Sequence, residues 1–198
     1  MKPAVFLDRD GTINEEVGYI RDLDHLKLIS GAASAIAKLN RAGIPAVLVT
    51  NQSGPARGYY DEAWVRTLLD RLSALLHEEA GATLDARYYC PHLPPDEGGV
   101  VEGYARHCSC RKPATGMILQ AAREHDLDVP RSFVVGDKAS DILLGHNAKA
   151  RTVLLETGYG RDVLAGRYQF PIRPDHVAAH LDDAVDWILD EIARPALA

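Results

Sequence analysis

Short apolar runs and longer amphipathic stretches alternate along the chain. The apolar runs have the length of buried strands and end in polar or glycine-containing turns. The longer stretches repeat their apolar residues at the three- and four-residue spacing of a helix that packs one face against a core. The expected strands are 4–7, 44–49, 86–89, 132–136 and 152–155. The expected helices are 31–42, 61–81, 116–125, 137–147 and 181–192.

Local signals mark some of the helix ends. Asp61 is expected to cap the start of the longest helix and Gly81 to end it, and Thr115 is expected to cap the helix at 116–125. Between these two helices, residues 90–113 show no periodicity and are rich in proline and glycine. A loop of this length needs something to hold it in place.

The alternation of strands and helices predicts an α/β fold, a Rossmann-like three-layer sandwich around a mainly parallel sheet. We expect one domain over residues 1–198, without a large cap domain. Ligands of such sheets bind at the carboxyl ends of the strands. Three expected strands end there in polar pairs, and these are Asp8/Asp10, Thr50/Asn51 and Asp137/Asp141.

The composition of the chain limits the classes of molecule that it is expected to bind. The 198 residues are 46% hydrophobic and 25% charged, with a net charge of −6 and a pI near 5.7. An acidic chain is a poor match for nucleic acid or anionic lipid. The sequence has no apolar run long enough for a membrane span and no cleavable signal pattern. We therefore expect a cytoplasmic protein, and nothing in the sequence demands more than a monomer.

The acidic pairs point to phosphoryl chemistry. Asp8 could attack phosphorus and form an acyl phosphate, and Asp10 could exchange protons with the leaving group and with water. Asp137 adds the hard oxygen ligands that Mg²⁺ prefers. Thr50 and Asn51 could bind phosphate oxygens, and Lys112 could neutralise their charge. Each pair alone is typical of an ordinary turn, so the functional interpretation depends on their joint appearance.

The stretches FLDRDGTIN, VTNQSG, CRKP and VGDKASD resemble, in this order, the four motifs of the haloacid dehalogenase (HAD) superfamily of phosphotransferases. The resemblance covers most of the chain and implies a HAD-like fold and a Mg²⁺-dependent phosphomonoester hydrolase. It implies catalytic roles for Asp8, Asp10, Thr50 and Lys112, and phosphate binding by Asn51. The Mg²⁺ ligands would be Asp8, Asp137 and the main-chain oxygen of Asp10, with Asp141 as a less direct member.

Three cysteines and a histidine in the long loop predict a second metal site. Cys90, His92, Cys108 and Cys110 could form a closed tetrahedral Zn²⁺ site at about residues 90–110. A closed site is structural, and this one would hold the loop beside Lys112. The alternative that the cysteines are merely small buried residues is weakened by their clustering. His107 is a rival ligand, and His92 is preferred.

The loop is similar to that of the zinc-containing HAD branch of heptose bisphosphate and histidinol-phosphate phosphatases. Its length favours hydrolysis of the C7 phosphate of D-glycero-D-manno-heptose 1,7-bisphosphate, in nucleotide-activated heptose synthesis for cell-surface glycans. Histidinol-phosphate phosphatase in histidine synthesis is the alternative, and a silent zinc-stabilised binding module is a third. Arg57 and Arg111 are candidate contacts for the far end of a bisphosphate, against the alternative of plain surface arginines. The anomer remains open, and residues 158–174 have no assigned role.

Overall fold

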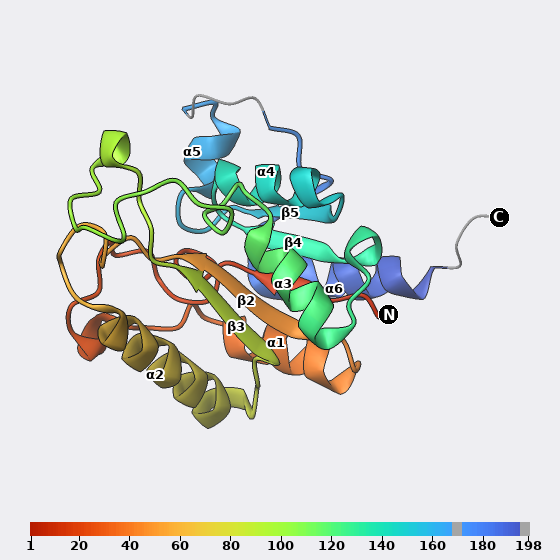
Figure 1. The fold of residues 1–198 in the computed structure, drawn as a ribbon. Coiled ribbons are helices and arrows are strands. Elements are labelled where there is room, and N and C mark those ends of the chain that lie inside the picture. The colour runs from red at the N-terminus through yellow and green to blue at the C-terminus, as the bar shows by residue number, and fades with distance from the viewer. Residues whose placement is uncertain (168–171, 195–198) are drawn as a thin grey trace.

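Six strands form the central sheet of the computed structural model, which describes residues 1–167 and 172–194. Their order across the sheet is β3-β2-β1-β4-β5-β6, and every neighbouring pair is parallel (Figure 1). The strands are β1 (Val5–Leu7), β2 (Ala46–Asn51), β3 (Ala86–Cys90), β4 (Phe133–Gly136), β5 (Arg151–Leu155) and β6 (His176–Ala178). The expected α/β fold with a parallel sheet is confirmed.

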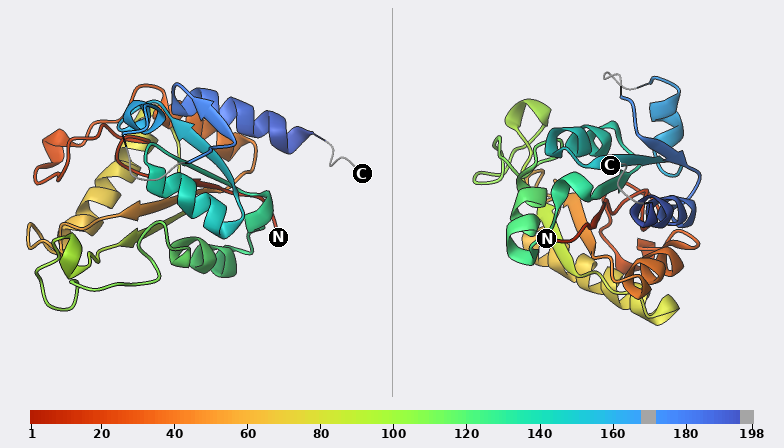
Figure 2. Two further views of the ribbon diagram at one scale, coloured as in Figure 1. Left: turned by 90° about the horizontal axis from the view of Figure 1, so that it is seen from above. Right: turned by 90° about the vertical axis from the view of Figure 1, so that its right-hand side faces the viewer.

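Helices cover both faces of this sheet and give three layers (Figure 2). The α-helices are α1 (Ala32–Arg41), α2 (Glu62–Ala80), α3 (Gly116–His125), α4 (Ala139–Ala148), α5 (Gly160–Leu164) and α6 (Leu181–Ala193). Short 3-10 turns occupy Leu23–His25, Pro95–Glu97 and Val129–Arg131. Helices α1, α2 and α6 share one core with one face of the sheet, and α3 and α4 pack on the other face.

The central strand β1 shows how the sequence builds these two cores. Side chains of a strand alternate between its two faces. Val5 and Leu7 therefore belong to the core under α1 and α6, whereas Phe6 belongs to the core under α3. All three side chains are fully buried, which explains why β1 appears in the sequence as a continuous apolar run.

Several element ends differ from the sequence prediction. Strand β2 begins at Ala46 rather than 44, because Pro45 has no N–H to donate to a ladder, and it continues through Asn51. Helix α4 begins at Ala139, two residues later than expected, and the Asp141 carboxylate accepts a hydrogen bond from Lys138 N there. Thr115 occupies the N-cap position of α3, but its side chain makes no capping hydrogen bond.

Two elements were missing from the prediction, α5 and β6. Both are short and follow β5; α5 lies within residues 158–174, to which no role was assigned, and β6 lies just after them. Residues 168–171 of that segment lie outside the described part of the chain. Among the helices that are described, none combines the length and the apolar character needed to cross a bilayer.

Candidate active site

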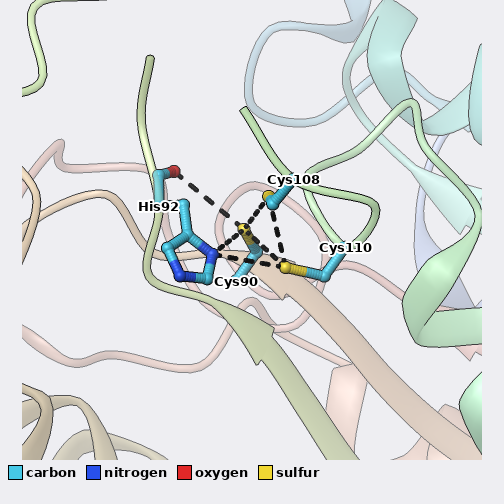
Figure 3. A group of neighbouring side chains, drawn as sticks. All are labelled: Cys90, His92, Cys108 and Cys110. Carbon is cyan, nitrogen blue, oxygen red and sulfur yellow. Dashed lines mark hydrogen bonds between the residues drawn. The ribbon is translucent and has the colours of Figure 1, made fainter. Parts of the chain in front are cut away.

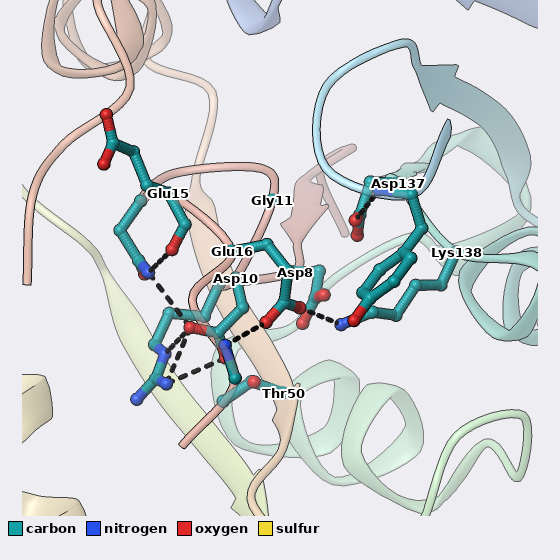
Figure 4. A network of polar contacts seen from close by, with 12 residues as sticks. Asp8, Asp10, Gly11, Glu15, Glu16, Thr50, Asp137 and Lys138 are labelled. Carbon is teal, nitrogen blue, oxygen red and sulfur yellow. Dashed lines mark hydrogen bonds and ion pairs between the residues drawn. The ribbon is translucent and has the colours of Figure 1, made fainter. Parts of the chain in front are cut away.

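Three carboxylates meet at the carboxyl edge of the sheet. Asp8 follows β1, Asp137 follows β4, and Asp141 lies in the first turn of α4. One ligand oxygen from each lies within 4.8 Å of the others, and all three residues are buried. Because β1 and β4 are adjacent parallel strands, their ends bring Asp8 and Asp137 together as the sequence predicted (Figure 4).

Lys112 joins this cluster from the long loop. Its Nζ lies 2.7 Å from Asp8 Oδ1 and 2.6 Å from Asp141 Oδ1, and it donates a 3.1 Å hydrogen bond to the carbonyl of Val49. The Lys112 side chain is only 3% exposed. A buried ammonium group with two carboxylate partners is held in one position and stays charged, because burial lowers its pKa but Asp141 and Asp8 together raise it further.

Lys112 and Lys138 affect the pKa values of Asp8 and Asp141 to different extents. Burial opposes ionisation of Asp8, but the Lys112 and Lys138 ammonium groups outweigh it and hold the pKa of Asp8 below its ordinary value. For Asp141, burial and the neighbouring Asp8 charge outweigh Lys112, and the pKa is raised. Asp8 is thus the carboxylate of this pair that is kept ionised, which is the form required of a nucleophile.

Asp137 is the least satisfied member of the cluster. Burial and then the charge of Asp8 raise its pKa to about 8. Its Oδ2 accepts a 2.8 Å hydrogen bond from Tyr159 N, whereas its buried Oδ1 has no partner among the residues that the structure describes. An orphaned buried carboxylate oxygen beside a second carboxylate fits a hard cation such as Mg²⁺, whose charge would favour the ionised form of Asp137.

Two glycines make room for the Asp137 side chain. A Cβ on Gly11 would lie 2.2 Å from Asp137 Oδ2, and one on Gly158 would lie 2.1 Å from the same oxygen. Both residues also have positive φ angles, 80° and 51°. Larger residues would be excluded at both positions. Thr157 Oγ1 donates a hydrogen bond to the Gly11 carbonyl, so residues 157–159 close one side of the cluster.

Asp10 lies beside the cluster, but its side chain turns toward another set of donors (Figure 4). Arg9 donates to Asp10 Oδ1 at 3.0 Å through Nε and at 2.7 Å through Nη2. Asn14 Nδ2 lies 2.9 Å from Oδ1, and Gln52 Nε2 lies 3.2 Å from Oδ2. The Asp10 side chain is therefore outside the group of three possible metal ligands.

Thr50 and Asn51 end β2 on the next edge of the site. Thr50 Oγ1 accepts a 2.9 Å hydrogen bond from Gln52 Nε2. The Asn51 amide pairs with the backbone of Lys112, because Nδ2 donates to its carbonyl at 3.2 Å and Oδ1 accepts from its N–H at 3.0 Å. Asn51 thus fixes the backbone that carries Lys112.

The three cysteines and His92 also converge (Figure 3). The sulfur atom of Cys90 lies 3.5 Å from that of Cys108 and 3.2 Å from that of Cys110, and Cys108 and Cys110 are 3.3 Å apart. His92 Nδ1 lies 3.5 Å from Cys110 Sγ and 3.7 Å from Cys90 Sγ. Four N and S atoms at these separations can surround one Zn²⁺ ion at about 2.0–2.3 Å.

The donor chemistry of this cluster fits zinc as well. Hydrogen bonding with Cys90 and His92 lowers the pKa of the Cys110 thiol to about 5, so the cluster already favours one thiolate before a metal supplies its charge. His107, the rival ligand, lies elsewhere. Its side chain is 81% exposed, and its Nε2 is 3.8 Å from Asp96 Oδ1.

A pocket of ≈ 850 Å³ is lined by Asp10 and by Lys112, which connects it to Asp8 of the carboxylate cluster. The cationic side chains at its wall are Arg9, Arg57, Arg111, Lys112 and Lys138. Both predicted arginines contact Glu97 of the long loop. Arg57 Nη2 donates to its carbonyl at 3.1 Å, and Arg111 Nη2 lies 3.3 Å from its Oε2. Arg111 Nη1 also donates to the carbonyl of His92 at 3.2 Å, which links the pocket wall to the cysteine cluster.

Sequence reasoning missed several residues of the site. Lys138 lies 2.7 Å from Glu16 Oε2 and 5.1 Å from the centre of the Tyr159 ring, and it lines the pocket. Arg9 and Gln52 contact Asp10 as described above. Lys138, Arg9 and Gln52 are each adjacent in sequence to a predicted site residue. That adjacency is the sequence feature that could have identified them. Nothing local identified Glu16.

Known proteins resemble this chain in sequence and in structure. The HAD-hydrolase-like family model matches residues 109–184. The D-glycero-D-manno-heptose-1,7-bisphosphate 7-phosphatase of Thermosynechococcus vestitus is 53% identical over 192 residues, covering 97% of this chain and 98% of that protein. The D-glycero-beta-D-manno-heptose-1,7-bisphosphate 7-phosphatase of Escherichia coli K12 is 39% identical over 192 residues, covering 96% and 90%.

Among solved structures, one similar chain is the D,D-heptose 1,7-bisphosphate phosphatase of B. bronchiseptica, complexed with magnesium and phosphate. It is 34% identical, has a TM-score of 0.82, and the match covers 96% of this chain and 99% of that one. Similarity of this extent shows that the two proteins share a family as well as a fold.

Proposed function

The chain belongs to the heptose 1,7-bisphosphate 7-phosphatase family of HAD-like phosphatases, and from this premise we propose that it hydrolyses the C7 phosphate of D-glycero-D-manno-heptose 1,7-bisphosphate. The reaction would proceed through a phospho-aspartate on Asp8. The observation that carries the proposal is the buried contact of Asp8 with Lys112, beside the unpartnered oxygen of Asp137. This is an ionised nucleophile placed next to a site for a hard cation.

The first step is attack of the Asp8 carboxylate on phosphorus. The P–O bond to C7 breaks as the acyl phosphate forms, and Asp10 gives its proton to the departing C7 oxygen. In the second step Asp10 takes a proton from water, and the resulting hydroxide attacks the same phosphorus. The acyl P–O bond breaks, phosphate leaves, and Asp8 is restored with its charge. Asp10 ends the cycle with the proton that it began with.

Charge on the phosphoryl group needs compensation during both steps. Lys112 lies against Asp8 and would face the transferring group, and Thr50 and Asn51 would supply neutral donors. Mg²⁺, held by Asp8, Asp137 and the main-chain oxygen of Asp10, would supply the charge that lets an anionic nucleophile approach an anionic ester. Asp141 would act through Lys112, since its carboxylate contacts that ammonium group.

The cysteine cluster supports this chemistry only indirectly. With Zn²⁺ bound to Cys90, His92, Cys108 and Cys110, the long loop would be fixed two residues before Lys112. No ligand position would remain for water, so the role is structural. Arg111 would be fixed along with the loop, because it donates to the His92 carbonyl.

The substrate assignment draws on the relatives and on the pocket wall. Named relatives act on heptose 1,7-bisphosphates. The pocket holds more cationic side chains than one phosphate needs, and Arg57 and Arg111 would bind the phosphate at C1. Small phosphorylated sugars are thus the expected partners, within nucleotide-activated heptose synthesis for cell-surface glycans.

We further propose that residues 1–198 act as one domain, since the site takes its groups from several elements around one sheet, and that the protein acts as a monomer. Three reduced cysteines that hold zinc favour the cytoplasm as the compartment. Sedimentation of the purified protein and cell fractionation test these two points.

Phosphate release in the presence of Mg²⁺ tests the function directly. The substrates are the two anomers of heptose 1,7-bisphosphate and histidinol phosphate, measured side by side with the pure protein. We expect release from a heptose bisphosphate at a kcat/KM well above that for histidinol phosphate. Preference for histidinol phosphate would keep the mechanism and refute the substrate, and no release from any of the three would refute the activity.

A further inference from the structure

Arg9 is the bulkiest of the almost fully buried side chains among the described residues, and it borders the pocket. The residue is 1% exposed, although it lies in the loop directly after β1. Within the described part of the chain, its side-chain hydrogen bonds all go to one residue, Asp10, through Nε and Nη2 at 2.7–3.0 Å. Its third nitrogen, Nη1, is buried and has no partner among the described residues.

Stability alone does not explain this arrangement. Burying an arginine–carboxylate pair costs desolvation energy that the ion pair roughly offsets, so apolar residues would serve a core as well or better. Adjacent residues also need no cross-link to stay close. The guanidinium fork does fix one thing, the rotation of the Asp10 carboxylate, because its bonds define both the plane and the position of the two oxygens.

The two oxygens of Asp10 are left in different states. Oδ1 accepts three hydrogen bonds, two from Arg9 and one from Asn14 at 2.9 Å. Oδ2 accepts 2.8 Å and 3.2 Å bonds from Arg9 Nη2 and Gln52 Nε2. Oδ1 has three donors and Oδ2 has two, and the Gln52 bond to Oδ2 is the longest of the five. Oδ2 is therefore the oxygen that can more readily give up a donor and exchange a proton with a substrate.

On the basis of the function proposed above, we propose that Arg9 is a positioning residue that presents Oδ2 of Asp10 to the leaving group, with Gln52 as its partner. Gln52 Nε2 bonds both Asp10 Oδ2 and Thr50 Oγ1. A glutamine amide can donate to a carboxylate or, after rotation, accept from a carboxylic acid. Gln52 can therefore contact Oδ2 in both of its protonation states, while Arg9 holds Oδ1.

The proposal predicts a difference between two substrates that a purely structural role for Arg9 would not produce. Proton donation matters for an alkoxide leaving group, which is a poor one, and matters little for p-nitrophenolate, which departs without a proton. In the second step Asp10 acts as a base toward water for both substrates, so the comparison concerns the first step alone. Loss of Arg9 should slow release of the leaving group from a sugar phosphate far more than release of p-nitrophenolate. Damage to folding, to the nucleophile or to the metal site would slow both.

The test measures KM and the single-turnover rate of leaving-group release for both substrates with Arg9→Met, Arg9→Lys, Gln52→Leu and Asp10→Asn. We expect Arg9→Met to lower this rate about 100-fold for the sugar phosphate and less than about 3-fold for p-nitrophenyl phosphate. Arg9→Lys keeps the charge but loses the fork, so its sugar-phosphate loss should be smaller, about 10-fold. The double variant Arg9→Met/Asp10→Asn should be no slower than Asp10→Asn alone, since both changes remove one function.

Arg131→Met, in which a side chain that is 65% exposed is changed far from the pocket, is the matched control and should leave both rates unchanged. If Arg9→Met fails to fold, as judged by melting and zinc content, Gln52→Leu and Arg9→Lys carry the test. Equal losses on both substrates in a folded variant would overturn the proposal. If the wild-type protein rejects heptose bisphosphate, the proposed substrate fails, and the best alkyl phosphate in the panel takes its place in the same comparison.

Discussion

The carboxylate cluster and the cysteine cluster are linked through Lys112 but are opposite in construction. Asp8, Asp137 and Asp141 come from separate elements of the sheet edge, and the buried Oδ1 of Asp137 has no partner among the described residues. The cysteine cluster takes its ligands from the end of β3 and one loop, and its four ligand atoms face one another. The first is incomplete without something from outside the chain, whereas the second could be completed by a single ion.

This contrast separates a site for chemistry from a site for architecture. An incomplete polar cluster beside a pocket can bind substrate and cation together, while a closed cluster can only hold its own chain segment. Lys112 connects the two, because it follows Cys110 by two residues and contacts Asp8. Changes in the carboxylate cluster should therefore abolish turnover and spare the fold, and changes in the cysteine cluster should weaken both.

The largest effect is expected at Asp8. Asp8→Asn should reduce kcat by at least about 10⁴-fold, because an amide cannot form the acyl phosphate. Melting temperature and zinc content should stay near those of the wild-type protein. Rates are measured by phosphate release, with Asp24→Asn at an exposed position as the control. Turnover by the pure Asp8 variant would refute its assignment as nucleophile.

A second, smaller loss is expected when the cysteine cluster is broken. Cys110→Ser should remove zinc, which is present near one ion per chain in the unmodified protein purified without added metal. The melting temperature should fall by roughly 10 °C, because the energy of a structural zinc site is part of the folding energy. kcat/KM should fall about 100-fold as Lys112 loses its position.

Ser109→Ala is the matched control for this change, since Ser109 lies between two of the predicted zinc ligands and its side chain is exposed. It should keep zinc, stability and rate. Elemental analysis that finds no zinc in the wild-type protein would contradict the structural assignment. A Cys110 variant that loses zinc but keeps full activity would separate the two clusters more completely than we expect.

The sequence predicted the central fold well because its buried strands are continuous apolar runs. Five of the six strands were expected, and the missing one, β6, has three residues at the edge of the sheet. Helix α5 has five residues, too few for a helical period to be visible in the sequence. Both elements depend on packing against β5 and its surroundings, and the local hydrophobic pattern of the sequence does not reveal such tertiary contacts.

Site residues that directly follow a strand could be predicted from the sequence. Contacts by which one side chain positions another residue could not. Asp8 and Asp137 were placed together by the parallel arrangement of β1 and β4. The pairing of Arg9 with Asp10 could not be predicted, because adjacent side chains in extended backbone ordinarily point apart. The bond between Asn51 and Lys112 spans 61 residues of sequence, and only the folded chain reveals it.

Asn51 offers a way to loosen Lys112 without touching either cluster. Asn51→Leu removes the two hydrogen bonds that hold the Lys112 backbone and also the amide proposed as a donor to phosphate, and kcat should fall about 10-fold. Asn40→Leu is a close control, because the Asn40 amide makes the same paired contact with the backbone of Thr83 at 3.0 Å and 2.9 Å. Both variants should lose similar stability, about 1–2 kcal/mol. Equal rates for the two would refute a positioning role for Asn51.

The smallest expected effect is a shift in melting temperature that tests the incompleteness of the carboxylate cluster. The pKa of Asp137 is about 8 without metal, against an ordinary value of 3.8. Between these values the folded protein holds a proton that the unfolded chain releases. Stability of the metal-free protein should therefore fall as pH rises toward 8, and then level off. The fall is expected because the ionised Asp137 is buried beside Asp8.

Mg²⁺ should reverse this loss, since it binds the ionised form. The rise in melting temperature on adding Mg²⁺ should thus be a few degrees larger at pH 8.5 than at pH 6, as measured by calorimetry at constant ionic strength. Asp137→Asn has nothing to titrate at this position, so its response to Mg²⁺ should be small and nearly independent of pH. An equal Mg²⁺ response at both pH values in the unmodified protein would mean that Asp137 is already ionised and satisfied without the cation, and the contrast between an incomplete and a closed cluster would fail.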